Sequence, residues 1–284
     1  MHYIMLLFLV FLIFLLLSCM LVRRAAQRAA FDPEWILSKT PAYHNIKFED
    51  VIFRTRSRRK LHGWYLKNSE AKSTILFLHG NTGNISSYAD EVCMLYKNLK
   101  SNIFIIDYRG YGKSQGHPQM RGLYRDALAA YAYLIKKKKA DPKKLICFGH
   151  SMGGAIAAYL ATRRKIQALI ITSAFSSIGD IISILFPRWL ASILKILNPV
   201  RFPTLQYIKK IHCPVLLMHG AEDAIVPSTL GKKVYDAVST PKLWYNIPNA
   251  GHNQIFLQGG SKYWYLVKSF IHKTINDEAL QELS

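Results

Sequence analysis

The fold is decided by one stretch of sequence, Gly149-His150-Ser151-Met152-Gly153-Gly154. A serine with a glycine two positions away on each side is typical of a sharp turn that lifts the hydroxyl out of a strand, where a base can reach it. Residues 144–148 are strand-like, and residues 155–161 are rich in helix formers. The stretch therefore predicts a strand, a tight turn that carries Ser151 as a nucleophile, and a helix. An unreactive serine in an ordinary strand-to-helix turn is the alternative.

Strands and helices alternate on both sides of this turn. We predict strands at 45–55, 61–67, 73–78, 102–107, 144–148, 167–173, 214–219 and 242–247. Helices are predicted at 85–99, 121–137, 155–161, 228–238 and 261–275. The basic turn 56–60 should join the first two strands as a hairpin. This alternation predicts an α/β fold with an eight-stranded, mostly parallel sheet and helices on both faces.

Residues 174–212 interrupt the alternation, because this segment is longer than a usual crossover connection. Apolar residues recur at helical spacing in 178–186 and, after Pro187, in 190–197. Two short amphipathic helices that form a small cap over the carboxyl edge of the sheet fit this pattern. Ordinary core helices fit it almost equally well.

A nucleophilic serine needs a base, and the base needs a carboxylate that orients it. Asp223 and His252 lie in the loops after the last two predicted strands. The chain order Ser151, Asp223, His252 therefore predicts a catalytic triad at the carboxyl edge of the sheet. Glu222 is the alternative acid. Asp223 could instead cap the following helix, and His252 could be an ordinary surface histidine.

The oxyanion that forms on an attacked carbonyl group needs hydrogen-bond donors, which are commonly backbone N–H groups. Met152, directly after the nucleophile, supplies one of them. A glycine-rich turn at 79–83 follows the third predicted strand, and the N–H of Asn81 is the second candidate. His79 begins this turn, and we predict that it braces the turn and does not react.

Residues 3–22 form an apolar run that is long enough to span a hydrocarbon core of ~30 Å. The run has no Lys or Arg before it, which argues against a cleaved signal peptide. We therefore predict a single-pass transmembrane anchor at 1–24. The catalytic domain is predicted at 25–284, with the cap at about 174–212.

Positive charge marks both the end of the anchor and the whole chain. Arg23, Arg24 and Arg28 directly follow the apolar run, which predicts a cytoplasmic catalytic domain. The alternative is a lipoprotein that is acylated at Cys19 outside the cytoplasm. The formal net charge of +21, from 38 Lys and Arg against 17 Asp and Glu, favours anionic membrane lipids as partners. No nucleic-acid recognition motif accompanies this charge, so no nucleic-acid partner is predicted.

Neither a metal nor a cofactor is predicted. The four cysteines show neither metal-ligand spacing nor a disulfide framework. Cys147 and Cys213 fall in or beside predicted strands, where they should be buried apolar residues. The sequence leaves the oligomeric state open.

The chain resembles the α/β-hydrolase superfamily, and within it the small-capped, membrane-anchored branch that includes alpha/beta hydrolase domain-containing protein thirteen. The matching segments are 78–84, 107–114, the Ser151 turn, and the loops of Asp223 and His252. The likeness runs from about 45 to 275. The basic turn at 57–60 departs from relatives, which often carry Asp-Gly there. This departure leaves catalysis untouched but puts the local turn geometry and the surface that the turn presents in doubt.

The resemblance implies a serine hydrolase that cleaves apolar acyl esters or lipids through an acyl-enzyme, with Ser151, His252 and Asp223 as the triad. The residues themselves indicate the same reaction. An acyl-thioesterase of proteins or lipids and a peptidase are alternatives within the same chemistry. A non-catalytic binding module on the hydrolase scaffold is the alternative from another class.

Overall fold

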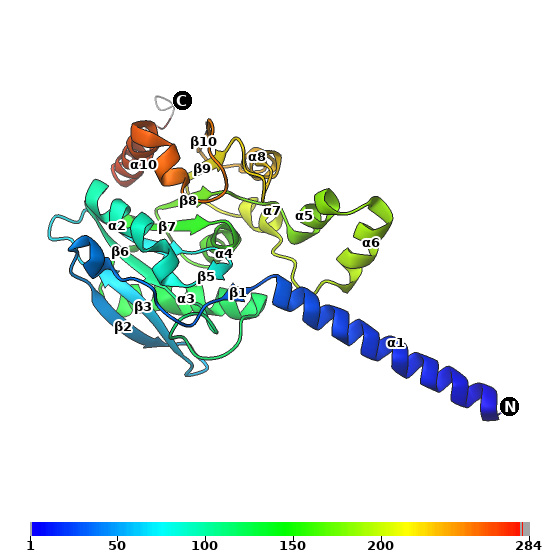
Figure 1. Cartoon of the computed structure of the whole chain (residues 1–284). Helices are drawn as coiled ribbons and strands as arrows, with labels where there is room; N and C mark the ends of the chain where they lie inside the picture. The colour runs from blue at the N-terminus through cyan, green and yellow to red at the C-terminus, as the bar shows by residue number, and fades with distance from the viewer. Residues whose placement is uncertain (1, 279, 281–284) are drawn as a thin grey trace.

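A central twisted sheet organises the computed structural model, which describes residues 2–278 and 280 (Figure 1). The sheet contains β2 (Glu49–Arg54), β3 (Lys60–Leu66), β4 (Ser73–Leu78), β6 (Ser101–Ile106), β7 (Leu145–His150), β8 (Ala168–Thr172), β9 (Val215–Gly220) and β10 (Lys242–Ile247). Two short strands, β1 (Asp32–Pro33) and β5 (Thr82–Gly83), form a separate parallel pair.

The strand order in the eight-stranded sheet is β10-β9-β8-β7-β4-β6-β3-β2. Five of its strand pairs are parallel, from β10 through β9, β8, β7 and β4 to β6. β3 is antiparallel to both β6 and β2, so the predicted hairpin is present at this edge. The predicted eight-stranded, mostly parallel sheet is therefore confirmed.

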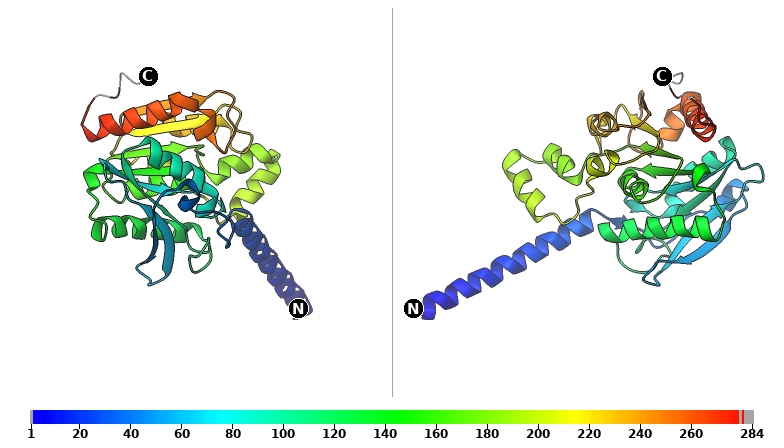
Figure 2. Two further views of the ribbon diagram at one scale, coloured as in Figure 1. Left: turned by 60° about the vertical axis from the view of Figure 1, so that its left-hand side comes forward. Right: turned by 180° about the vertical axis from the view of Figure 1, so that it is seen from behind.

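Helices cover both faces of the sheet (Figures 1 and 2). They are α2 (Ala89–Asn98), α3 (Met120–Lys136), α4 (Met152–Ala161), α7 (Thr204–Ile208), α8 (Ser228–Asp236), α9 (Ile255–Gln258) and α10 (Gly260–Ile275). Short 3-10 helices lie at Pro41–His44, Ile85–Tyr88 and Pro142–Lys144. One apolar core lies between the sheet and α3, α4 and α8, and the other lies between the sheet and α2 and α10. Cys147 and Cys213 are buried as predicted.

Two further helices, α5 (Ile178–Leu185) and α6 (Arg188–Leu197), occupy the segment that interrupts the alternation. Figure 2 shows them as a lobe that projects from the body of the molecule. α5 has no buried residue, and α6 has only Ala191 buried. Ile178 and Ile181 of α5 are partly buried against the core beside α3 and α4. Most of the other large apolar side chains of these two helices are exposed.

The N-terminal helix α1 (His2–Ala29) extends away from the body of the molecule (Figure 1). Its segment Met5–Ala29 is long and apolar enough to cross a membrane, and its most apolar window has no part buried inside the protein. A 28-residue helix is about 42 Å long. The domain therefore leaves this apolar surface uncovered.

Candidate active site

The turn at Ser151 brings a strained serine to the carboxyl end of β7. β7 ends at His150 and α4 begins at Met152, so a single residue makes the change of direction. Ser151 has φ +51° and ψ −116°, a conformation that L-residues rarely adopt. The strain is held by close packing, because a Cβ added at Gly153 would lie 1.8 Å from the carbonyl oxygen of Leu78. Larger side chains at this glycine would push α4 away from β4.

The structure brings Ser151, His252 and Asp223 together. The Oγ of Ser151 lies 3.1 Å from Nε2 of His252, and Nδ1 of His252 lies 2.7 Å from Oδ2 of Asp223. Because an ionised carboxylate only accepts, Nδ1 of His252 carries a hydrogen and donates it to Asp223. Nε2 is then free to accept the proton of the serine hydroxyl. The three side chains are therefore arranged for nucleophilic catalysis.

Asp223 is fixed as an acceptor from several directions. Burial opposes its charge, but hydrogen bonds from His219, His252 and the Val226 N–H hold the pKa of the carboxyl well below its usual range. Its Oδ1 also accepts from the N–H of Ile225 at 3.0 Å. The carboxylate thus stays ionised and oriented toward the imidazole. Glu222, the alternative acid, is exposed to solvent.

His219 is a contact of the site that the sequence reasoning missed. Its Nε2 lies 2.8 Å from the carbonyl oxygen of Val226 and 3.1 Å from Oδ2 of Asp223. Both neighbours are acceptors, so Nε2 must carry the hydrogen. His219 is fully buried at the end of β9. Its position directly before the Asp223 loop is the sequence signal that could have identified it.

The two candidate oxyanion donors lie on neighbouring elements. The N–H of Met152 is the first of α4 and has no partner within the helix. On the other side, a Cβ added at Gly80 would lie 3.7 Å from the Cβ of Ser151, which puts the turn that carries Asn81 against the serine. The hydroxyl of Tyr111 donates to the Asn81 carbonyl oxygen at 2.8 Å.

His79 and His150 are both buried beside the serine, and neither contacts its hydroxyl. The Nδ1 of His79 lies 2.8 Å from the Gly80 carbonyl oxygen, and burial lowers the pKa of His79 to about 4. The Nδ1 of His150 lies 3.0 Å from Oγ1 of Thr172. Burial, assisted by the nearby His252, lowers the pKa of His150 to about 3. Both imidazoles are therefore neutral, and the bracing role predicted for His79 fits its contacts.

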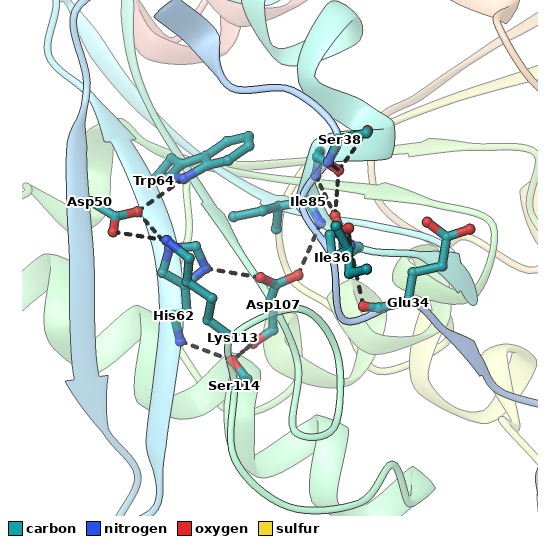
Figure 3. Close-up of polar contacts among 12 residues, drawn as sticks. Glu34, Ile36, Ser38, Asp50, His62, Trp64, Ile85, Asp107, Lys113 and Ser114 are labelled. Atoms are coloured by element: carbon teal, nitrogen blue, oxygen red, sulfur yellow. Dashed lines mark hydrogen bonds and ion pairs between the residues drawn. The ribbon is translucent and has the colours of Figure 1, made fainter.

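A polar network centred on the buried side chains of His62 and Asp107 ties the segment 107–114 to the turn after β4 (Figure 3). His62 lies between two carboxylates, with Nδ1 2.9 Å from Asp107 and Nε2 2.6 Å from Asp50. Burial opposes its charge, but the hydrogen bonds with these two carboxylates raise the pKa of His62. The other oxygen of Asp107 accepts the Ile85 N–H at 2.9 Å. The network thus joins the antiparallel edge of the sheet to the Asn81 turn.

A cavity of about 280 Å³ opens beside the triad. Its lining includes Tyr88, Glu91, His150 and Asn253. Glu91 is nearly fully buried, and one of its carboxylate oxygens has no hydrogen-bond partner. Burial raises the pKa of Glu91 to about 8.

We expect Glu91 to make stability depend on pH. The folded protein holds this proton more tightly than the unfolded chain, in which a glutamate has a pKa of about 4.3. The free energy of unfolding should therefore fall as pH rises from about 5 to 8, by on the order of 1 kcal/mol per pH unit. The side chain in the variant Glu91→Gln stays neutral at every pH. The unfolding midpoint of this variant in detergent should therefore not decrease between about pH 5 and 8 as that of the wild type does. Glu70→Gln, at an exposed carboxylate, should keep it; parallel curves for Glu91→Gln and wild type would refute the assignment.

Within residues 2–278 and 280, no cluster of three or more His, Cys, Asp or Glu side chains is arranged to hold a metal ion. The four cysteines, all in this part of the chain, are free.

Comparisons with known proteins agree with this geometry. Residues 69–209 match the family model described as serine aminopeptidase, S33. The chain is 35% identical over 251 residues to the alpha/beta hydrolase domain-containing protein WAV2 of Arabidopsis thaliana, with 82% of each chain covered. It is 32% identical to protein bem46 of Schizosaccharomyces pombe, over 82% of this chain and 79% of the relative. A Saccharomyces cerevisiae relative described as a membrane protein is 31% identical, with 82% of each covered.

Solved structures share the fold. An esterase of Pyrococcus furiosus superimposes with a TM-score of 0.69 at 21% identity, covering 86% of this chain and 98% of the esterase. A puromycin-hydrolyzing peptidase of Mycobacterium tuberculosis superimposes with a TM-score of 0.64 at 18% identity, covering 81% of this chain and 39% of the peptidase. At these identities the likeness establishes the architecture of the sheet and its helices.

Proposed function

The chain belongs to the α/β-hydrolase superfamily, and from this premise we propose that it is a membrane-anchored serine hydrolase that cleaves carboxylic esters with apolar acyl groups. One observation carries the proposal: the unbroken chain of contacts from the Ser151 hydroxyl through His252 to Asp223. A hydroxyl in this setting is activated for attack on a carbonyl carbon.

The reaction follows from the positions of the protons. As the Oγ of Ser151 attacks the carbonyl carbon, its proton moves to Nε2 of His252, and Asp223 stabilises the resulting imidazolium. The N–H groups of Asn81 and Met152 hold the negative oxygen of the tetrahedral intermediate. When the ester bond breaks, His252 returns the proton to the leaving alcohol and the acyl group remains on Ser151. Water, activated by the same imidazole, then releases the acid and restores the serine.

The apolar helix α1 and a relative described as a membrane protein suggest a membrane anchor. We propose that the catalytic domain lies on the cytoplasmic side, because Arg23, Arg24 and Arg28 follow the most apolar part of the helix. Anionic lipids are the proposed partners of this basic chain. A C-terminal reporter that is active only outside the cytoplasm would contradict this orientation and favour acylation at Cys19.

The acyl-enzyme mechanism can also cleave thioesters and amides, so the next experiment should determine which type of bond the protein cleaves. Purified full-length protein in detergent should be given an oxyester, a thioester and an aminoacyl amide that share one acyl chain. We expect oxyester turnover and an acyl group on the Ser151 peptide after acid quenching, detected by mass spectrometry. Faster thioester turnover would reassign the protein as an acyl-thioesterase. Turnover of the amide alone would make it a peptidase.

A further inference from the structure

Two helices of the projecting lobe carry a large exposed apolar surface. The large apolar side chains exposed by 40% or more on α5, α6 and the turn between them are Ile184, Leu185, Phe186, Trp189, Ile193 and Ile196. A surface helix normally turns such residues toward a core. Large apolar side chains that gather on one exposed lobe in this way are typical of an interaction site.

The pattern on α6 suits a membrane surface. Trp189, Ile193 and Ile196 are spaced by four and three residues, so they share one face of the helix. Arg188 and Lys195 are exposed on the same helix. Apolar and tryptophan side chains on one face, with cations beside them, are typical of helices that lie in the interface of an anionic bilayer.

The lobe and α1 project from the same side of the molecule, as the views in Figures 1 and 2 agree. α6 also contacts α1 directly. When α1 crosses a bilayer, the lobe therefore lies close to the surface that the helix enters. Asp180, the one acidic residue in 174–212, pairs with Lys233 at a distance of 3.3 Å, so the segment offers little repulsion to anionic headgroups.

We propose that α6, together with the turn that precedes it, inserts its apolar face into the headgroup boundary of the bilayer that α1 crosses. The protein then holds the membrane at two places, by a spanning helix and by an interfacial helix. This surface extends the proposed function, because it would hold the catalytic domain against the bilayer in which an ester with an apolar acyl group dissolves.

A spin label tests the contact without relying on activity. In a Cys19→Ser background, Ile196→Cys on α6 and Ile52→Cys on β2 should each carry a nitroxide in the full-length protein. Ile52 is 53% exposed on the edge strand and serves as the control. In vesicles of equal parts phosphatidylcholine and phosphatidylserine, the label at 196 should collide more with oxygen than with a water-soluble nickel complex, and the label at 52 should show the reverse. Water-like behaviour at 196, or dipolar broadening between two labelled copies, would overturn the proposal.

Activity gives a second readout. The triple variant Trp189→Ser, Ile193→Ser, Ile196→Ser should hydrolyse a bilayer-embedded ester about tenfold more slowly, and should hydrolyse a water-soluble short-chain ester at the wild-type rate. Equal rates on both substrates would refute a role in substrate delivery. Ser151→Ala distinguishes this failure from failure of the proposed function, because it should lose activity on both esters.

The segment that follows α1, residues 31–38 and here called the exit segment, pairs with the turn that carries Asn81. Here the N–H of Asp32 donates to the Asn81 carbonyl oxygen at 3.1 Å, and the N–H of Glu34 donates to Gly83 at 2.9 Å. The exit segment is therefore the parallel strand partner of the turn that carries a candidate oxyanion donor.

The side chain of Asn84 joins the same two segments by hydrogen bonds. Its Nδ2 donates to the carbonyl oxygens of Glu34 at 3.2 Å and Ile36 at 2.8 Å. Its Oδ1 accepts the Ser86 N–H at 2.8 Å, and the Ser38 N–H donates to the Ser86 hydroxyl at 3.0 Å. Asn84 is fully buried, so these bonds are shielded from water.

We infer that the exit segment positions the Asn81 N–H for the oxyanion, so that the chain leaving the membrane completes the active site. This inference rests on the proposed function. A donor that is misplaced by 1 Å loses transition-state stabilisation but leaves ground-state binding largely intact.

Two substitutions test this positioning role, with a matched control. Glu34→Pro removes the N–H that donates to Gly83, and Asn84→Asp removes the donor to Glu34 and Ile36. Each should lower kcat about 10- to 100-fold per folded protein, with KM within about twofold. Glu34→Ala keeps the N–H and should behave as wild type. Wild-type kcat in either folded variant, or a rise in KM alone, would overturn the inference. An inactive wild type would instead overturn the proposed function.

Discussion

Replacing Ser151 with alanine should lower ester hydrolysis by on the order of 10⁴-fold or more, because no acyl-enzyme can form without its Oγ. The same variant should lose labelling by a fluorophosphonate probe, which reacts only with an activated serine. The fold should survive, since alanine removes one oxygen. The positive φ at position 151 is already imposed by the packing of α4 against β4, so alanine adds no new backbone strain. Gel fluorescence for the label and initial rates on a water-soluble ester give the two readouts.

Ser173 offers a matched control for this experiment. It is also buried and also has a positive φ, of +52°, but its hydroxyl donates to the backbone carbonyl of His252 at 3.0 Å. Ser173→Ala should retain labelling and lose about tenfold in rate at most, through looser support of the His252 loop. If wild type labels no more strongly than Ser151→Ala and hydrolyses no ester, the chain is a binding module on the hydrolase scaffold.

The sheet and the positions of the triad residues could be predicted because both follow from local patterns in the amino-acid sequence. Each strand is a short apolar run bounded by turn residues, and the serine turn has a strict steric requirement at Gly153, where a Cβ would strike the Leu78 carbonyl oxygen. Parallel strands then place their carboxyl ends on one edge of the sheet. Residues that follow different strands, such as Asp223 and His252, must therefore converge there.

The missed contacts depend on partners far apart in the sequence. β1 and β5 have two residues each, too few to show any periodicity, and they pair across about fifty residues of chain. His62 lies in a hairpin strand, where nothing local indicates that Asp107, directly after the neighbouring strand β6, will lie beside it. The sequence left the environment of the two lobe helices open for another reason. An amphipathic pattern indicates that one face of a helix has an apolar environment, but it does not tell whether protein or lipid supplies that environment.

Asp223→Asn should be nearly as damaging as loss of the serine, lowering kcat by on the order of 10³- to 10⁴-fold. In the wild type, Nδ1–H of His252 donates to the Asp223 carboxylate 2.7 Å away. The amide of the variant keeps the size of the side chain but presents an N–H₂ group or a neutral oxygen to His252. The imidazole can then take the tautomer in which Nε2 carries the hydrogen and cannot accept the serine proton. The imidazolium that forms during attack also loses its counter-charge. Initial rates at pH 7 to 8, together with unfolding midpoints, measure the effect.

Glu222→Gln is the control that decides which acid serves His252, because it makes the same chemical change one residue earlier in the same loop. Its side chain is exposed, so this variant should keep its rate within about twofold. The contrast between the two variants should be large because Asp223 is buried, and hydrogen-bond donors that include His219 at 3.1 Å keep its carboxyl ionised. Solvent cannot replace those contacts once the charge is lost. An Asp223→Asn enzyme that keeps more than about a tenth of the wild-type rate would show that His252 does not depend on this carboxylate for its orientation. Equal losses in the two variants would show that the acidic loop acts as a whole, with no single carboxylate paired to the imidazole.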